Sequence, residues 1–505
     1  MPGRVAERPD PHGIPERPVM ADEPSMTRLS EEPQRWTTSI AVHYEGKKPM
    51  SRYIRWYLIV SIATSMVWAA VNGILMPNQI QLIEFGQFFL GPDAGVDLPA
   101  LTELGRAVAA GQVTPTAEQA RQLGLLSDFE TARAASLGLV TTVSAILVML
   151  LQPVIGVLSD RTRSKLGRRA PWILYAGLFG AVLLAGVRFA PSIAILVVLW
   201  SLTELTLNVA GNPLQATVAD RVPRERRGRV TSWTSLGAII GGLLGGIGAG
   251  ALFGMIGLDF YFILALFVAL TVVLFVIRNR DESSVDMVRE PFKWGAFFRG
   301  YASALKARDY RWLWISRVLF FFGYSTSTVL SLYMLQSYIT PAMSAAEASA
   351  TAPLISIASL PATLIAVSIS GRLSDRLGVR KPFIIVASVL MAASLAVPLI
   401  SPTLPGLFIQ SIVTGLAFGI YLPVDNAMFI DVLPDPETAG RDLGLSIVAT
   451  NLGQSLAPAL AAVMVAVTGG YAGVWVAAVV LVAGATFTVA PIRERRARNA
   501  AQVQV

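Results

Sequence analysis

A short, strongly basic segment occurs twice in this chain, each time between two long apolar stretches. The first copy, GVLSDRTRSKLGRRAP, occupies residues 156–171, and the second, GRLSDRLGVRKP, occupies residues 371–382. In both copies Asp-Arg follows a glycine by four residues, and a basic cluster and a proline come next. So short a basic loop between apolar spans predicts a helical hairpin that turns on the cytoplasmic side, where Lys and Arg are retained. Because the hairpin recurs, we expect two similar halves with the same orientation.

The composition indicates a membrane protein. Hydrophobic residues make up 53% of the chain and charged residues only 15%, which is far more apolar material than one soluble core can hold. The net charge of +8 comes largely from the short loops between apolar spans. We therefore expect a lipid bilayer, and not nucleic acid, as the partner of these basic residues.

The sequence offers little for catalysis. It has no cysteine, and its two histidines, His12 and His43, lie in the polar N-terminal segment. We therefore expect no metal site, no cofactor and no enzymatic activity. The Gly-rich Lys-Ser/Thr motif that binds nucleotide phosphates is missing too, so ATP-driven pumping has no support.

The two basic loops resemble the signature loops of the major facilitator superfamily of secondary transporters. The matching positions are Gly156, Asp160, Arg161, Arg168 and Arg169 in the first copy and Gly371, Asp375, Arg376 and Arg380 in the second. The first copy has four extra residues, 162–165, and its Gly-Arg-Arg-x-Pro ending is similar to the branch of glycoside–cation symporters and sucrose transporters. The resemblance implies an all-α integral membrane fold with twelve transmembrane helices in two pseudo-symmetric six-helix bundles.

The resemblance also implies a gating role for the two loop aspartates. Each would contact the start of the fifth helix of the opposite half while the inside is closed, Asp160 near Arg441 and Asp375 near Arg229. A helix N-terminus favours a nearby carboxylate because it carries partial positive charge. The alternative is that both aspartates are ordinary solvated charges.

The apolar spans and basic loops predict five segments and one topology. The segments are a disordered cytoplasmic tail over 1–51, a six-helix bundle over 52–277, a cytoplasmic linker over 278–311, a second six-helix bundle over 312–492 and a basic cytoplasmic tail over 493–505. We expect a monomer in the plasma (inner) membrane with both termini in the cytoplasm. The acidic-leaning connection 84–133 is predicted to lie outside as a cap with short surface helices, and the second span to begin near residue 136.

Polar side chains inside the predicted spans are the candidates for solute binding and coupling. Glu204, Asn208 and Asn212 recur at four-residue spacing and so share one face of the fourth span. The corresponding residues of the tenth span are Gln410, Tyr421 and Asp425, and Asn72 and Tyr324 occupy the first and seventh spans. A carboxylate inside a bilayer normally faces a partner or a water-filled cavity. The alternative is a structural polar seam between helices.

Two further patterns concern packing and lipid contact. In the fifth span Gly237, Gly241 and Gly245 recur at four-residue spacing, which predicts close approach of a neighbouring helix. Arg317 lies near the cytoplasmic end of the seventh span, and we expect its side chain to snorkel to the membrane surface.

These observations favour a secondary transporter that moves a small polar organic solute, a sugar or glycoside, by alternating access. Amide side chains both donate and accept, which suits hydroxyl recognition. The resemblance to cation symporters implies acidic residues in the second span, which this chain lacks, and this argues against sodium coupling. The expected coupling ion is the proton, carried by Glu204, and facilitated transport without a coupling ion stays open. A proton-driven exporter of drugs or metabolites and a non-transporting sensor of the same fold stay open as alternatives.

Overall fold

The computed structural model describes residues 47–286, 295, 304–433 and 439–492. All of them belong to one compact unit, Ala41–Val505, and nearly all lie in helices. The predicted tails, most of the linker after residue 286 and the side chain of Arg441 fall outside the described part of the chain.

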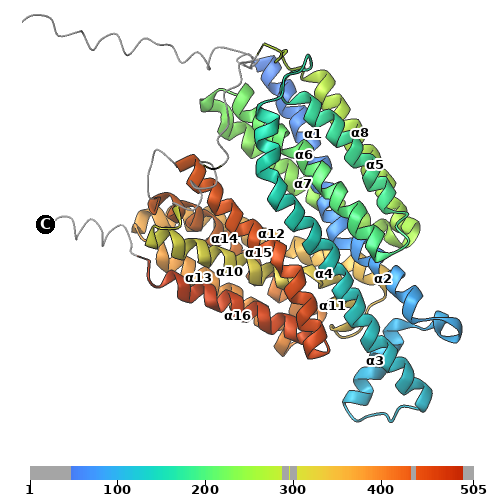
Figure 1. Ribbon diagram of the computed structural model, residues 1–505. Helices are drawn as coiled ribbons and strands as arrows, with labels where there is room; N and C mark the ends of the chain where they lie inside the picture. The colour runs from blue at the N-terminus through green and yellow to red at the C-terminus, as the bar shows by residue number, and fades with distance from the viewer. Residues whose placement is uncertain (1–46, 287–294, 296–303, 434–438, 493–505) are drawn as a thin grey trace, which may run out of the picture. The chain divides into compact units, whose positions relative to one another are not determined.

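The first half of the chain forms a group of helices that pack on one another (Figure 1). They are α1 (Lys47–Ala70), α2 (Met76–Phe88), α4 (Ala117–Asp160), α5 (Gly177–Val187), α6 (Ile193–Arg221), α7 (Arg224–Ile256) and α8 (Phe260–Arg278). Short π- and 3-10 segments join them, namely η2 (Val71–Leu75), η3 (Gly91–Gly95), η4 (Trp172–Ala176) and η5 (Gly257–Asp259), and α3 (Leu98–Ala109) lies between η3 and α4.

The second half forms a corresponding group. It comprises α10 (Arg308–Val329), α11 (Ser331–Ser337), α12 (Ala345–Leu377), α13 (Lys381–Ile400), α14 (Leu404–Asp431), α15 (Ala439–Thr468) and α16 (Ala472–Val489). The packing repeats between the groups: α1 packs on α7 and α8 as α10 packs on α15 and α16, and α6 packs on α4 and α5 as α14 packs on α12 and α13. Contacts of α4 with α15 and of α7 with α12 join the two groups.

Membrane-spanning capacity follows from helix length and composition. Among the described residues, nine helical stretches are long and apolar enough to cross a membrane, or ten if α10 and α11, which meet at 45°, form one span. One of the nine, residues 225–278, contains both α7 and α8. A shorter apolar stretch, Trp172–Val187, combines η4 and α5.

The glycine stripe of α7 permits close contact with α1, as its spacing predicted. A Cβ atom on Gly241 or Gly245 would collide with the backbone of α1 at Ile62 or Met66, and one on Gly237 would lie 2.8 Å from Leu58. Backbones at such a distance gain dispersion contacts that larger side chains would prevent.

The connection between the first two spans differs from the expected cap of separate short helices. α4 begins at Ala117, well before the predicted start of the second span near residue 136, and continues unbroken for 44 residues. A capping box starts it, because the Thr116 side chain accepts from the backbone of Gln119 and the Gln119 side chain accepts from the backbone of Thr116.

We call residues 89–135, comprising η3, α3 and the first part of α4, the extension. It has a small apolar core of its own made of Phe89, Leu101, Leu126 and Phe129. We call the helix ends near the extension the extension end, and the opposite ends, where Asp160 and Asp375 lie, the motif end.

Candidate functional site

A cavity of about 970 Å³ lies between the two groups of helices, and we call it the main cavity. Its walls include five of the residues predicted for solute binding or coupling: Asn72, Glu204, Asn208, Tyr324 and Gln410. They come from η2, α6, α10 and α14, so both halves contribute. The structure therefore brings together side chains that are more than 300 positions apart in sequence.

The π-segment η2 positions Asn72 in the cavity wall. Pro77 follows within the first turn of α2 and has no backbone N–H to donate to the preceding turn. Wider π-turns inside long helices are a common response to such an interruption, and they occur frequently at functional sites. Asn72, Gly73 and Ile74 all line the main cavity.

Glu204 is the acidic residue in the wall of the main cavity. Ser144, on α4, lines the same cavity. One turn along α6, the Asn208 side chain donates to the Glu204 backbone carbonyl at 2.9 Å. Trp68 and Trp200, also in the wall, meet edge-to-face with ring centroids 6.0 Å apart. The N-terminal side of the cavity thus combines a carboxylate, amides and aromatic rings, a combination that suits a hydroxylated solute.

Three predicted binding residues lie outside the cavity lining. Asn212 accepts a hydrogen bond from Gln152 at 3.2 Å, and so bridges α6 and α4. Tyr421 is fully buried and stacks on Phe320 with ring centroids 3.7 Å apart. Asp425, one turn further along α14, is also fully buried.

Arg317 does not snorkel to the membrane surface, so that prediction was wrong. Its side chain is buried between α10 and α14, with Nε 3.1 Å from an Asp425 carboxylate oxygen. It also donates to Asn426 at 2.7 Å and lies 4.9 Å from the Phe429 ring centroid. A buried guanidinium needs a counter-charge, and Asp425 supplies it from the neighbouring helix.

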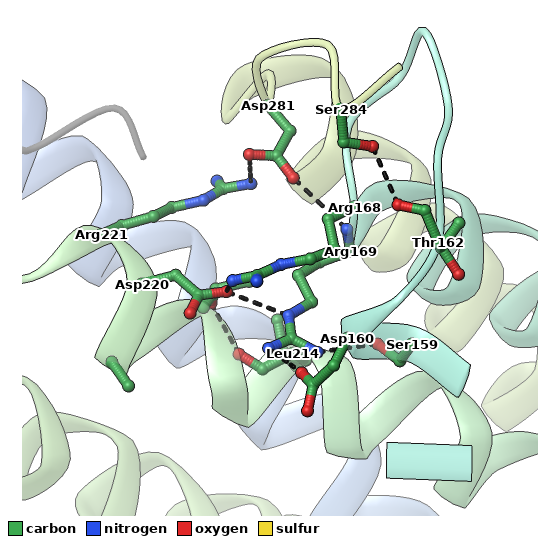
Figure 2. A network of polar contacts seen from close by, with 12 residues as sticks. Ser159, Asp160, Thr162, Arg168, Arg169, Leu214, Asp220, Arg221, Asp281 and Ser284 are labelled. Atoms are coloured by element: carbon green, nitrogen blue, oxygen red, sulfur yellow. Dashed lines mark hydrogen bonds and ion pairs between the residues drawn. The ribbon is translucent and has the colours of Figure 1, made fainter. Parts of the chain in front are cut away.

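At the motif end of the first half, the loop arginines form a polar network with the end of α6 (Figure 2). Arg169 contacts Asp160 at 2.5 Å and Asp220 at 3.0 Å, and Arg168 contacts Asp220 at 2.7 Å. The segment after α8 joins the network, because the Asp281 carboxylate accepts from the Arg169 backbone and pairs with Arg221. The loop is therefore anchored to the end of α6 and to the segment that follows α8.

The second half repeats the main contact of this network. Arg380 pairs with Asp431 at the end of α14 at 2.8 Å, and it lies 3.8 Å from Asp375. Asp220 and Asp431 occupy the same place in the matching stretches ADRVP and IDVLP. The side chains of Asp160 and Asp375 are 57% and 72% exposed, and the ion pairs described for them lie within their own halves.

At the extension end the two halves are in direct contact. Asn78 of α2 donates to Ser349 of α12 at 2.9 Å, and the Tyr333 hydroxyl of α11 donates to the Pro77 carbonyl at 2.8 Å. A Cβ on Gly250 of α7 would collide with the backbone of Ser349. Because glycine and small polar side chains lie at this seam, the backbones of the two halves approach closely.

A buried arginine forms the centre of the extension end. Arg133 of α4 is 1% exposed and donates to three groups of the second half: Gln336 at 3.1 Å, Ser337 at 2.6 Å and the Tyr471 hydroxyl at 3.2 Å. Its guanidinium also lies 4.6 Å from the Tyr333 ring centroid. Within its own half it donates to Gln81 at 3.3 Å and lies 3.6 Å from the Glu130 carboxylate, so both halves contribute partners to the buried charge.

The extension adds a second connection between the halves through α3. Arg106 donates to the backbone carbonyls of Ser337 and Ile339 at 2.8 and 2.9 Å. The Glu103 carboxylate accepts from the backbone of Ala342 at 2.7 Å and from Arg106 at 2.6 Å. The extension therefore holds the segment that follows α11.

Comparison with known proteins identifies the family. A family model described as MFS/sugar transport protein matches residues 126–488, which include both signature loops and the main cavity residues other than those of α1 and η2. The chain belongs to this family. It is a major facilitator transporter, and the related proteins and structures are transporters and not enzymes.

Two curated relatives match this transporter over short stretches, each at 32% identity. One is the general alpha-glucoside permease of Schizosaccharomyces pombe, with 19% of this chain and 21% of the permease covered. The other is the multi-drug resistance efflux pump PmrA of Streptococcus pneumoniae, with 25% of this chain and 30% of the pump covered. The transporter thus covers less than a third of the length of either relative.

Solved structures share the fold. A bacterial homologue of the human lysosomal transporter Spinster, inward-facing and unoccupied, has a TM-score of 0.60 at 12% identity, over 88% of this chain and 96% of that one. A mutant of the nucleoside transporter NupG has a TM-score of 0.61 at 14% identity, over 87% of this chain and 99% of that one. At these identities the likeness concerns the fold alone.

Several side chains of the cavity wall and of the contact between the halves were not predicted from the sequence. Trp200 and Trp475 line the main cavity, but a lone tryptophan in an apolar span gives no sign of its neighbours. Arg133 fell within the predicted outer loop, where a charge is unremarkable. Among the described residues no group of three or more His, Cys, Asp or Glu could hold a metal ion. The expectation of no metal site stays a prediction.

Proposed function

We propose that this transporter moves a neutral sugar, most specifically an α-glucoside, across the membrane by alternating access, coupled to protons through Glu204. The observation that carries the proposal is the main cavity, which lies between the two halves and has one acidic residue in its wall beside amides and tryptophans. Tryptophan faces pack against the apolar faces of sugar rings, and amides bond to hydroxyls. The family and the similarity to an alpha-glucoside permease support this solute class.

The proposal includes twelve spans in two six-helix bundles. Counting α7 and α8 separately, joining α10 to α11 and including the short apolar α5 gives twelve. The repeated packing pattern of the two groups supports two pseudo-symmetric bundles. In this topology the motif end and both termini are cytoplasmic, the extension is external, and the monomer lies in the plasma membrane.

The topology is tested by labelling single cysteines in this cysteine-free chain with an impermeant thiol reagent in intact cells. A cysteine at position 112, in the extension, should react, and one at position 290 should not. The reverse labelling would overturn the topology.

The described contacts support an inward-facing state. The halves meet at the extension end, and the loop aspartates Asp160 and Asp375 are mostly exposed. We propose that Asp160 and Asp375 engage the opposite half only when the motif end closes, which is the role implied for them by the family. The ion pairs of the inward-facing state would then be exchanged for contacts across the seam.

Proton coupling is tested with Glu204→Gln, which preserves the shape of the side chain and removes its titration. In proteoliposomes, maltose uptake driven by a pH gradient should be lost. Exchange of labelled for unlabelled maltose should survive, because exchange requires no net proton movement. If the Gln variant still accumulates maltose against its gradient, Glu204 is a structural residue and a different group couples transport.

The solute class is tested by thermal stabilisation of the purified transporter. A ligand that binds only the folded state raises the melting temperature by mass action. Maltose and sucrose should stabilise the protein, and uridine and a lipophilic cation should not. Stabilisation by the cation alone would instead favour drug export, the alternative that the similarity to the efflux pump PmrA supports.

A further inference from the structure

Three arginines gather where the start of α1 meets the end of α8, and we call them the arginine cluster. Arg52 and Arg55 lie near the start of α1, and Arg278 is the last residue of α8; all three side chains are exposed. The two helices pack on each other, and the Arg278 guanidinium lies over the Trp56 ring, 5.9 Å from its centroid. Because Arg52 lies one turn before Trp56 on the same face of α1, Arg52 and Arg278 both lie beside this ring.

The arginine cluster lies at the motif end of the first half. The hydroxyl of Tyr53, the residue after Arg52, is hydrogen-bonded at 2.6 Å to Thr217, which precedes Asp220 of the polar network by three residues. Asp281, three residues after Arg278, belongs to that network itself. The cluster is therefore at the level of the first signature loop, where the proposed topology puts the cytoplasmic surface of the membrane.

The positive charge of the arginine cluster is not balanced by the described residues around it. Neither residues 46–83 nor residues 260–280 include an Asp or a Glu. The first acid after α8, Asp281, pairs with Arg221, and the next, Glu282, makes no described ion pair. Arginines of both signature loops pair with carboxylates at the ends of α6 and α14, whereas no described ion pair involves the cluster. The cluster therefore suits an anion from outside the protein.

The chemistry of the arginine cluster suits a phosphate. Contact with Trp56 uses the flat face of the Arg278 guanidinium and leaves the N–H groups along its edge available. The planar fork of these donors matches the oxygens of a phosphate, and a guanidinium that is already held loses less freedom on binding. Tryptophan is also typical of the interface between bilayer and water, which is the depth of lipid headgroups.

An exposed apolar strip of α8 leads to the arginine cluster. Leu266, Leu270 and Ile277 are exposed and share one face of the helix, and Ile277 directly precedes Arg278. A ligand that matches both features carries an anionic group and a hydrocarbon chain, whereas a soluble phosphate matches only the cluster. Basic pockets between transmembrane helices on the cytoplasmic side bind anionic lipid headgroups. Charge and apolar contact together therefore favour a phospholipid.

We infer that the arginine cluster binds the phosphate of an anionic phospholipid of the cytoplasmic leaflet, with an acyl chain along the exposed strip of α8. The inference goes beyond the proposed solute transport and takes only the leaflet from the proposed topology. A lipid bound in this way contacts both α1 and α8, so it strengthens the packing of the first half. An anionic lipid should therefore stabilise the folded transporter more than a zwitterionic lipid with the same acyl chains.

The test titrates the purified transporter with dioleoylphosphatidylglycerol and, separately, with zwitterionic dioleoylphosphatidylcholine, and measures bound lipid by native mass spectrometry. Arg52→Gln combined with Arg278→Gln should weaken binding of the first phosphatidylglycerol by about tenfold, the loss expected for charge-assisted bonds from two exposed arginines. Binding of phosphatidylcholine should stay unchanged. If the double variant does not fold, Arg278→Gln alone should weaken phosphatidylglycerol binding by about threefold.

Arg163→Gln combined with Lys165→Gln is the matched control. Both side chains are exposed in the first signature loop, so this variant loses the same charge at the same end of the same half and should keep its affinity for phosphatidylglycerol. An equal loss in the two double variants would reduce the effect to general attraction between basic loops and anionic lipid, and would overturn the site. Unchanged affinity after loss of Arg52 and Arg278 would overturn it as well.

Two further outcomes separate the parts of the inference. If soluble glycerol phosphate displaces phosphatidylglycerol at an equal concentration, the acyl chain contributes nothing and the ligand is a soluble anion, which overturns the lipid assignment. If the cysteine at position 290 is labelled in intact cells and the one at position 112 is not, the proposed topology fails. The choice of leaflet then fails with it, while the lipid affinities still decide whether the arginine cluster binds the phosphate.

Discussion

The contact of Arg106 with the second half offers the sharpest test of how the extension end is held shut. Arg106→Gln removes a guanidinium that donates to two backbone carbonyls, one at the last residue of α11 and one just after it. The side chain is 27% exposed, so each of these charge-assisted bonds is discounted to about 1 kcal/mol. Their joint loss amounts to about 2 kcal/mol, which is a shift of about 30-fold in the equilibrium toward opening of this end.

The assay uses the absence of native cysteine. Ser349→Cys introduces one thiol at the seam, where the side chain is fully buried against Asn78. The rate at which a soluble maleimide labels this thiol reports the fraction of molecules that are open at the extension end. Adding Arg106→Gln to this background should raise the labelling rate by more than tenfold.

Arg188→Gln in the same background is the control. Arg188 pairs with Asp259 at 2.8 Å, also at the extension end, but both residues belong to the first half. Its loss should leave the labelling rate unchanged. If Arg106→Gln labels no faster than the control, the extension does not hold the halves together, and α3 is only a surface cap.

Three further predictions concern gating, helix packing and acid stability. Asp160→Asn should slow transport severalfold and raise the inward-facing population while leaving the melting temperature nearly unchanged, because a mostly exposed ion pair contributes about 0–1 kcal/mol; wild-type transport rates would leave Asp160 an ordinary solvated charge. Gly245→Val should lower the free energy of unfolding by about 1–3 kcal/mol, because the larger side chain forces α7 away from α1. Gly228→Ala is the control, since Gly228 has open space around it and the change should leave stability unaltered. Equal melting temperatures for the Gly245→Val and Gly228→Ala variants would disprove close packing of α7 on α1. Hydrogen bonds from Arg121 and a neighbouring glutamine hold the pKa of Asp93 below its usual value, so this contact stabilises the extension above about pH 4 and is lost as the pH falls below it. The difference in unfolding free energy between wild type and Asp93→Asn should therefore vanish in acid. A difference that stays constant with pH would contradict a stabilising role of the Asp93 carboxylate.

The sequence by itself determined the class of protein and much of its plan. Apolar spans and basic loops are local sequence features that can be recognised without the structure. A chain that contains so many of them can bury its apolar surface only in a lipid bilayer. The duplicated Gly-x-x-x-Asp-Arg motif indicated two related halves, and the family match agrees with the superfamily resemblance. The stripe at Gly237, Gly241 and Gly245 predicted a close helix contact because side-chain size acts directly on backbone distance.

Part of the candidate site was also readable from sequence. Glu204 and Asn208 share a helix face by their spacing alone, and both line the main cavity. Four-residue spacing places Asn212 on the same stripe, yet its side chain bonds to Gln152 between helices. Periodicity determines which residues share a helix face. The packing of neighbouring helices determines which part of that face lines the main cavity.

Other features were decided only by the tertiary structure. Arg317 is buried because Asp425 lies opposite it on a helix about a hundred residues away, and no local pattern contains that pairing. Three hydrogen-bond partners of the buried Arg133 come from the other half, two in α11 and the third, Tyr471, just before α16. Sequence periodicity specifies which residues share a helix face, whereas the pairing of charges and the shape of a cavity depend on how helices from the two halves meet.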